Sequence, residues 1–519
     1  MHDDDASTTF TASLRNSTDL RSTSLNEFSS NPIKYYLLCK KIKHIVGKPE
    51  TFVDVSKLQP MYEDLAQWFS RSDVVIKSKT MSFKDGVSFD YIPSEIQTHI
   101  PSLSNRVQYE FDTLGQMDKV HQQLTSKGAS HPEKLGQRAS TPSGGRNIKL
   151  CIASNTSQQE HSDIISLVYS WFCFLEQHVR KDCSKTLTIY LYLTDCTKKL
   201  PEKNTNIKPT ELSQNNVNSG FTMACKLNNE IYIFRREEWF KVLLHESMHA
   251  MGVDFSWYKN QKPIESILQK EFTGVQIAEW NISECYTEIW AEIINVLIQV
   301  YLVTKKQSFY HVKQIVYTAL YYESCWSRIQ CCKVLKYYGI TYQELLSNTT
   351  VYQETKTSVF SYYVLKCLLI CNIGLFIDWC SERTEGPLTV YRTQKNDTAN
   401  FSGDPSLRQA ELAKAQLLQA SPSNSQRELP VATSGGVLAD RRSPLRSEKL
   451  VEKRLSAPLP DLFSHIFDDE TIVLQNMISF GEFLVQLSQD NTHLQQLNYL
   501  QHMKIDLGDS LRMSLWSEG

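Results

Sequence analysis

The spacing of apolar residues predicts alternating strands and helices in the middle of the chain. Residues 147–153 alternate like a strand, residues 163–181 repeat with helical periodicity, and residues 186–193 form a second β-rich run. A short strand at 230–234 leads directly into a helix-forming run at 237–251 that contains no Gly or Pro. This order predicts a sheet with helices packed against it.

Helical periodicity dominates the rest of the ordered sequence. The apolar positions predict further helices at 61–69, 282–303, 309–337, 357–380 and 472–487. Gly252 follows the last apolar position of the run at 237–251, where a glycine commonly ends a helix. Strands in one part of the chain and helices in the others indicate an α+β protein.

Changes in composition divide the chain into segments. Polar stretches rich in Ser, Thr, Pro and Gln cannot bury enough apolar surface to fold, so we expect disorder there. The predicted segments are a disordered N-terminus at 1–30, an accessory mainly helical region at 31–125, a linker at 126–147, a central domain at 148–380, a long disordered insertion at 381–458, and a C-terminal helical segment at 459–519 that packs on the central domain.

Net charge and cysteine usage narrow the classes of partner. The formal net charge of −2 gives no overall field that would attract nucleic acid or an anionic membrane, so neither partner is predicted. The 13 cysteines are an odd, scattered set, and the polar N-terminus does not resemble a signal peptide, so we expect a reduced, intracellular protein. The basic cluster within 381–458 is either a solvated charged face or the binding site of a protein partner.

Two histidines and a glutamate form an H-E-x-x-H sequence near the end of the run at 237–251. His245 and His249 lie four residues apart, so on a helix both imidazoles point the same way and can reach one ion. Glu246 lies one step further round, where its carboxylate can reach a metal-bound water. The pattern predicts a Zn²⁺ site of the hydrolase type, although five letters of this kind also occur by chance.

A third zinc ligand has to come from elsewhere in the chain. Six residues after His249, where some zinc peptidases place a third histidine, stands Phe255. Asp254 is one residue early, and capping of the turn after the helix explains it better. Glu284, Glu288 and Glu292 instead repeat every four residues along an otherwise apolar helix. Three stacked carboxylates repel one another unless a cation lies among them, so this stripe is the better source of a ligand.

The order of these motifs resembles that of the gluzincin zinc metallopeptidases, and more loosely the uncharacterised metallopeptidase-like proteins of large DNA viruses. Glu288 to Glu292 resembles the gluzincin E-x-x-A-D motif, with Glu in place of the final Asp. The resemblance implies that Glu288 is the third ligand and that Glu292 orients a histidine ring. Glu284 then remains an alternative ligand, or the Glu of a capping box with Asn281.

The same resemblance extends to a strand upstream of the histidine motif. Asn218, Ser219, Gly220 and Phe221 resemble the edge strand on which these peptidases bind an extended substrate, with Gly220 as an extra residue. The implied fold is zincin-like over 148–380: a small mixed sheet with the active-site helix, followed by a mainly helical subdomain.

The function that follows is zinc-dependent hydrolysis of peptide bonds in a peptide or protein substrate, with Glu246 as general base. An oxyanion-stabilising residue is also expected, and four candidates lie on one helix, without a preference among them: His311, Tyr321, Tyr322 and Arg328. The alternative is a catalytically inactive zinc-binding scaffold or interaction protein with the same fold. The intact Glu246 favours the enzyme, because a purely structural site has no use for a general base.

Overall fold

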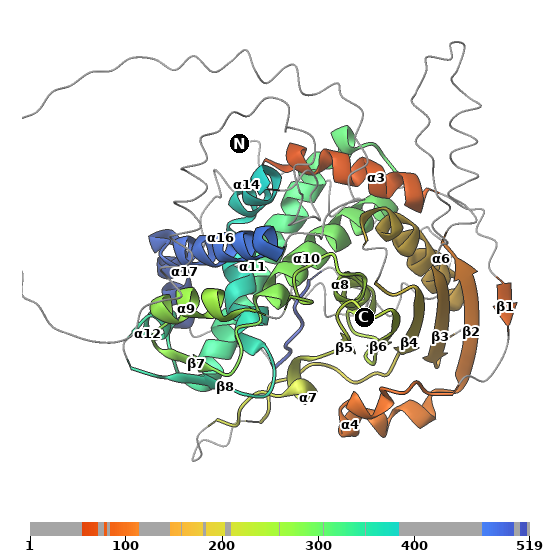
Figure 1. Cartoon of the computed structure of the whole chain (residues 1–519), viewed down its shortest axis with the longest axis horizontal. Helices are drawn as coiled ribbons and strands as arrows, with labels where there is room; N and C mark the ends of the chain where they lie inside the picture. The colour runs from red at the N-terminus through yellow and green to blue at the C-terminus, as the bar shows by residue number, and fades with distance from the viewer. Residues whose placement is uncertain are drawn as a thin grey trace, which may run out of the picture. The chain divides into compact units, whose positions relative to one another are not determined.

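Three parallel strands form the centre of a six-stranded mixed sheet in this computed structural model (Figure 1). They are β3 (Asn147–Ser154), β4 (Thr186–Tyr192) and β6 (Asn228–Ile233), and they confirm the three strands predicted from alternation. The strand order is β1-β2-β3-β4-β6-β5. The outer strands β2 (Asn105–Asp112) and β5 (Gly220–Thr222) run antiparallel to their neighbours β3 and β6, and β1 (Lys77–Lys79) pairs with β2.

The structure describes most of the ordered chain. The described residues are 54–70, 77–79, 84–113, 146–156, 158–179, 183–202, 209–258, 260–304, 306–347, 349–383, 470–502 and 509–515. They all belong to a single unit that comprises Met1–Arg392 and Leu462–Gly519. The predicted disordered N-terminus at 1–30 and nearly all of the linker at 126–147 and of the insertion at 381–458 lie outside the described residues, as does the predicted partner site in that insertion.

The two faces of the sheet carry different side chains. Ile189 and Ile231 represent the aliphatic face, which packs into the main core with the helices. The opposite face is aromatic: the rings of Tyr190 and Tyr232 stack with centroids 4.8 Å apart, and Phe221 stacks on Tyr232 at the same distance. Because side chains alternate along a strand, both faces of the central strands are buried, as is usual for parallel strands.

Helices cover the aliphatic face and extend the core away from the sheet (Figure 1). The helices that precede or carry the histidine motif are α3 (Gln59–Phe69), α4 (Ser94–Gln97), α6 (Gln158–Leu175), α7 (Gln214–Val217) and α8 (Trp239–Met251). Those that follow it are α9 (Lys262–Glu271), α10 (Ile282–Val303), α11 (Phe309–Tyr338), α12 (Tyr342–Leu345), α13 (Lys366–Cys371), α14 (Ile373–Arg383), α16 (Glu470–Ser488) and α17 (Asn491–His502). A π-helical turn, Phe360–Leu365, leads into α13, and β7 (Val275–Ile277) pairs with β8 (Tyr352–Glu354). The chain is therefore mixed α+β, as predicted.

Helix α10 lies at the centre of the helical part. Its residues are almost all buried, and it packs against α8, α11 and α3. By length and composition α10 could cross a bilayer, but 83% of its apolar window is buried inside the protein. The bent pair formed by Phe360–Cys371 and Ile373–Ser381 passes the same test together, with an 85° bend. The burial of α10 is that of a core helix, which explains why its sequence is mostly apolar.

The region predicted as a helical accessory segment, 31–125, is in part a piece of the sheet. Strand β2 pairs along its whole length with β3, from Asn105 opposite Ser154 to Asp112 opposite Asn147. Helix α3 packs against α6 and α10, so it too is part of the main core. The described part of this region is therefore helical in much of its length but is not a separate accessory segment, and the alternation of Val107, Tyr109 and Phe111 corresponds to a strand of the sheet.

A disulfide joins Cys183 and Cys225, which the expectation of reduced cysteines did not include. Cys183 precedes β4 and Cys225 lies in the loop after β5, where its backbone N–H donates to the carbonyl of His249 at 3.1 Å. The disulfide therefore ties the loop after β5, which contacts the end of α8, to the segment before β4. The other ten cysteines within the described residues are free.

The last described segment, 509–515, runs into the core between α8 and α11. The backbone N–H of Ser514 donates to Glu238 at 2.6 Å, and the indole of Trp326 donates to the carbonyl of Arg512 at 3.1 Å. Leu511 and Leu515 are buried. The C-terminal segment thus belongs to the framework that holds α8.

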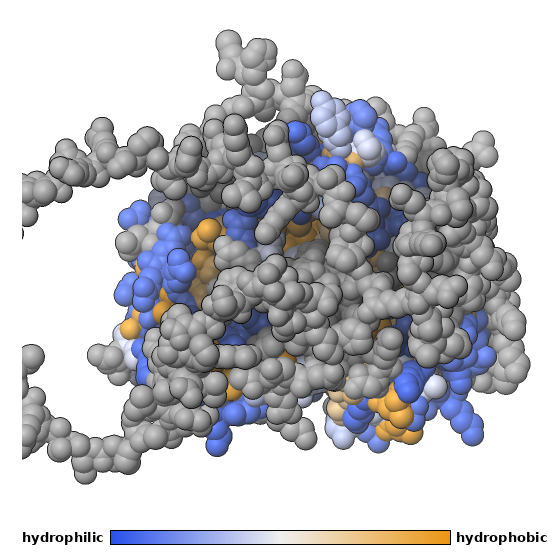
Figure 2. All heavy atoms as spheres, turned by 45° about the horizontal axis from the view of Figure 1, so that its top comes forward, coloured by the Kyte–Doolittle hydropathy of each residue, from blue (hydrophilic) through white to orange (hydrophobic). Residues whose placement is uncertain are grey.

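On the face shown in Figure 2, hydrophilic side chains predominate among the coloured residues, with apolar ones in smaller patches.

Candidate metal centre

Helix α8 brings the two motif histidines together. The Nε2 atoms of His245 and His249 lie 3.0 Å apart, as the four-residue spacing predicts. The helix begins after Glu238, whose φ is 61°, so Glu237 and Glu238, the first residues of the predicted run at 237–251, precede it. Glu238 pairs with the buried Lys198. It ends at Gly252 with φ 67°, which confirms the predicted stop. All 13 residues of α8 are buried, so the histidines are held firmly.

The third group at this point is Glu284, in the first turn of α10. Its Oε2 atom lies 3.1 Å from His245 Nε2 and 3.3 Å from His249 Nε2. Tetrahedral Zn²⁺ with ligand distances of 2.0–2.1 Å separates its ligand atoms by about 3.3 Å. The three atoms therefore fit around one ion, and two histidines with one glutamate are a known ligand set of catalytic zinc.

The surroundings of Glu284 keep its carboxyl group charged. Burial would raise the pKa of this carboxyl, but the His249 charge and hydrogen bonds from both imidazoles lower it well below its usual range. Its carboxylate is therefore ionised and available as a ligand.

Glu288, predicted as the third ligand, does not reach this point. Its Oε2 atom lies 3.1 Å from His245 Nδ1, on the other side of the ring, and its Oε1 atom accepts a hydrogen bond from Lys241 Nζ. A proton on Nδ1 would face this carboxylate and would leave the Nε2 lone pair directed towards Glu284. The structure therefore does not place the predicted ligand Glu288 with the two Nε2 atoms; Glu284, the alternative, lies there.

Glu292, predicted to orient a histidine ring, lies one further turn along α10 and does not contact the histidines. Its Oε2 atom pairs with Lys366 Nζ at 3.1 Å, in the core. The orienting role falls to Glu288 instead. The register is thus displaced by one helical turn from that implied by the resemblance: Glu284 and Glu288 hold the places expected for Glu288 and Glu292. Periodicity shows that three carboxylates share a face, but only the crossing of α8 and α10 decides which turn meets the histidines.

Asp254 orients the second histidine. Its Oδ2 atom accepts a hydrogen bond from His249 Nδ1, and Thr287 and Ser256 donate to the same carboxylate at 3.1 Å and 2.8 Å. The side chain therefore does more than end the turn after α8, which is the role that the sequence suggested. Each histidine has a carboxylate behind it, an arrangement typical of zinc ligands.

The predicted capping box at the start of α10 is absent. The amide of Asn281 donates to Ser358 Oγ at 2.9 Å and makes no side-chain bond to the helix, and the carboxylate of Glu284 faces the histidines. A local motif was therefore outweighed by contacts between distant segments.

A pocket of about 270 Å³ opens beside the three groups and Glu246. Its lining comes from β5, α8, α10 and the loops around them: Asn218, Gly220, Phe221, Thr222, Ala224, His245, Glu246, His249, Ser256, Gln261, Glu279, Asn281, Ser283, Glu284 and Tyr362. Burial raises the pKa of Glu246 to about 7, against the lowering effect of the two histidines. A carboxylate with a pKa close to neutrality can both accept and return a proton.

Strand β5 lies at the edge of the sheet, directly on α8. A Cβ added to Gly220 would lie 2.8 Å from the Tyr232 carbonyl oxygen, 2.9 Å from Val242 Cγ1 and 3.1 Å from Glu246 Cγ. Only glycine allows the strand this close to the helix. Asn218, Gly220 and Phe221 line the pocket, whereas Ser219 is buried. The residues that resemble a substrate strand thus lie beside Glu246.

Tyr362 is a pocket residue that the sequence did not single out. Its ring centroid lies 6.3 Å from that of His245. Burial, and then the neighbouring Glu284 and Glu246 carboxylates, raise its pKa well above the usual value, so the hydroxyl stays protonated and can donate. The position of Tyr362 depends on the π-helical turn, which no sequence pattern predicted.

The four candidates for oxyanion stabilisation on α11 do not line the pocket. Tyr321, Tyr322 and Arg328 are buried elsewhere in the core, and His311 contacts Ser308.

No family model, curated protein or solved structure matches this chain. Its chemistry therefore has to be argued from the arrangement of its own side chains.

Proposed function

We propose that the protein is a zinc-dependent metallopeptidase of the gluzincin type, with His245, His249 and Glu284 as metal ligands. The observation that carries the proposal is the approach of three ligand atoms to within 3.0–3.3 Å of one another beside a pocket that also holds Glu246. Zn²⁺ in this place would polarise a scissile carbonyl and lower the pKa of a water molecule in its open fourth position.

The ligand spacing supports the gluzincin assignment. Glu284 and Glu288 are four residues apart, so a ligand is followed one turn later by the carboxylate that orients a histidine. That is the spacing of the E-x-x-A-D motif, here in the sequence Glu284-Cys285-Tyr286-Thr287-Glu288. The alanine and aspartate of the motif are not kept, while the distances between side chains provide the same functional arrangement.

Protein side chains divide the remaining work. Glu246 removes the proton of the attacking water and later gives it to the leaving amine, a task that a pKa of about 7 suits. The Tyr362 hydroxyl donates a hydrogen bond to the developing oxyanion, because it stays protonated at the edge of the pocket. The β5 edge beside Glu246 accepts an extended peptide as an added strand, which places a backbone carbonyl near the ligands.

The decisive experiment compares Glu246→Gln with the wild-type protein on a panel of unstructured peptides. We expect kcat to fall about 10²–10⁴-fold, with unchanged zinc content by elemental analysis. Glu482→Gln, the same chemical change at an exposed position of α16, is the matched control and should leave both values unchanged.

Equal activity in wild type and Glu246→Gln would refute the peptidase mechanism. A wild-type protein that binds zinc through His245, His249 and Glu284 but cleaves no peptide of the panel would instead support the alternative of a zinc-binding scaffold.

A further inference from the structure

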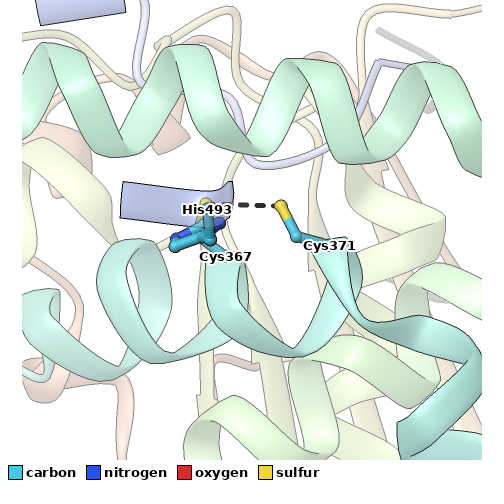
Figure 3. Close-up of side chains that lie close together, drawn as sticks. All are labelled: Cys367, Cys371 and His493. Carbon is cyan, nitrogen blue, oxygen red and sulfur yellow. Dashed lines mark hydrogen bonds between the residues drawn. The ribbon is translucent and has the colours of Figure 1, made fainter. Parts of the chain in front are cut away.

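Two cysteines and a histidine from distant segments meet in the helical part of the core. Cys367 and Cys371 lie one turn apart on α13, and His493 comes from α17 (Figure 3). One ligand atom from each lies within 4.8 Å of the others, and the two sulfur atoms are 3.9 Å apart. Buried cysteines often serve as small apolar residues, but that role does not account for the imidazole beside them.

The imidazole of His493 is buried, and its polar contact is with a thiol. The residue is 2% exposed, and neither ring nitrogen bonds a nitrogen or oxygen atom in the described part of the chain. Its ring instead lies beside the Cys371 thiol and edge-on to Tyr342. Buried polar groups in native proteins are nearly always satisfied, and a thiol is only a weak hydrogen-bond partner, so an imidazole beside two thiols indicates a ligand between them.

A third sulfur and a positive charge lie beside this group. The Cys331 thiol, from α11, is in hydrogen-bonding contact with that of Cys367. Arg328, also from α11 and 7% exposed, lies beside Cys371 and Cys367, and its Nε atom has no hydrogen-bond partner. A guanidinium favours thiolates over thiols. Three thiolates, one neutral imidazole and a divalent cation carry a net charge of −1, which Arg328 balances.

Burial opposes thiolates in the absence of a cation. It raises the pKa of Cys367 and that of Cys371 well above their usual values, even though Arg328 lowers both. A bound metal ion reverses this preference, because a coordinating thiol is deprotonated outright.

We propose that Cys367, Cys371 and His493 hold a structural Zn²⁺, with Cys331 as the fourth ligand. Tetrahedral zinc with Zn–S distances of 2.3 Å separates two sulfur ligands by about 3.8 Å, close to the 3.9 Å between Cys367 and Cys371. Four protein ligands without an open position are typical of structural sites, and thiolates with imidazole select zinc over the hard cations.

Such an ion would fasten the C-terminal helices to the rest of the core. His493 is the ligand from α17, while the three cysteines belong to α11 and α13. The site therefore joins segments on either side of residues 384–469.

Cobalt substitution in the full-length protein tests the proposal. Co²⁺ bound by thiolates gives a near-ultraviolet charge-transfer absorption, and the histidine–glutamate centre cannot contribute to it because it contains no sulfur. We expect this absorption in wild type, its displacement by Zn²⁺, and its loss in Cys371→Ser and His493→Gln. Each variant should bind zinc at this site at least about 100-fold more weakly, since removal of a ligand exceeds the cost of removing an outer partner.

Two controls separate this site from the other candidate centre. His245→Gln should leave the absorption unchanged, and so should Cys151→Ser, which removes a free buried cysteine of β3. Cys331→Ser should weaken the absorption; an unchanged spectrum in that variant would refute Cys331 as the fourth ligand.

The wild-type measurement needs no variant and remains decisive if the substitutions impair folding. Absence of the charge-transfer absorption in wild type would overturn the proposal, as would its persistence in both Cys371→Ser and His493→Gln. A disulfide between Cys367 and Cys371, found by mass spectrometry in protein that binds no metal there, would also overturn it.

Discussion

Each of the two candidate metal centres brings three ligand atoms close together, but their surroundings differ. The histidine–glutamate centre between α8 and α10 opens onto a pocket, carries carboxylates behind both imidazoles, and has Glu246 beside it. The cysteine–histidine centre among α11, α13 and α17 is built of thiols in the core. An open position and a nearby base are required for catalysis on a metal, whereas a closed set of sulfur ligands stabilises a fold. The surroundings of the two centres, more than the number of ligands, therefore distinguish their two roles.

One continuous segment connects the two centres. The π-helical turn Phe360–Leu365 places Tyr362 at the pocket, and α13 follows immediately with Cys367 and Cys371. Lys366, between them, pairs with Glu292 of α10. The position of Tyr362 is therefore linked to the packing of α13.

The largest expected effect comes from removing the carboxylate ligand of the open centre. Glu284→Ala should lower zinc affinity there by more than about 10³-fold, beyond the 10–100-fold typical of an outer partner, and should abolish peptidase activity. The cobalt–thiolate absorption of the other centre should remain. Zinc titration monitored by calorimetry, with Glu482→Ala as control, checks this. Retention of full zinc affinity at the open centre would show that Glu284 is not a ligand.

The next largest expected effect is on the chemical step of peptide hydrolysis alone. Tyr362→Phe removes one hydroxyl at the pocket and should reduce kcat about 10²–10³-fold, with little change in KM or zinc content. Tyr310→Phe, the same change at a residue that is 76% exposed, is the matched control for steady-state kinetics. A loss confined to KM would contradict oxyanion stabilisation.

A smaller effect should follow from the carboxylates behind the histidines. Asp254→Asn and the double variant Lys241→Met with Glu288→Gln should each weaken zinc binding about 10–100-fold at the open centre. The double variant is preferred because Glu288→Gln alone would leave Lys241 charged and unpaired in the core. Competition with a zinc chelator measures both affinities. Weakening as severe as that of Glu284→Ala would point to Asp254 or Glu288 as a ligand.

The smallest expected effect is on folding stability and concerns Glu354. Its carboxyl accepts a hydrogen bond from the Phe360 backbone N–H, at the start of the segment that connects the two centres. Burial raises its pKa to about 7. Because the folded carboxyl holds its proton more tightly than the unfolded one, stability is highest below about pH 4.5 on this account and falls as pH rises towards 7.

The slope that Glu354 contributes is at most about 1.4 kcal/mol per pH unit. Urea denaturation between pH 5 and 7 should show a smaller pH dependence in Glu354→Gln than in wild type, with zinc content unchanged at both centres. An identical pH dependence in the two proteins would show that Glu354 does not titrate in this range.

Short-range patterns in the sequence anticipated the central strands and the helix that carries His245 and His249. Alternation and helical periodicity are local properties, so they survive without knowledge of the fold. The alternation of β2 is present as well, in a region whose other elements are mostly helical. Periodicity could not place β5 at the edge of the sheet, which only the resemblance implied, because the strand order depends on which strands pair.

The amino-acid sequence by itself determined that two imidazoles share one face of a helix, that Glu246 lies beside them, and that a carboxylate stripe runs along α10. Only the tertiary structure decided that Glu284 meets the imidazoles while Glu288 and Asp254 lie behind them, that Tyr362 borders the pocket, and that His493 reaches two cysteines of α13. The physical reason is that a helical repeat fixes the angle of a side chain about its own axis, whereas the point at which two helices cross depends on the packing of the whole core.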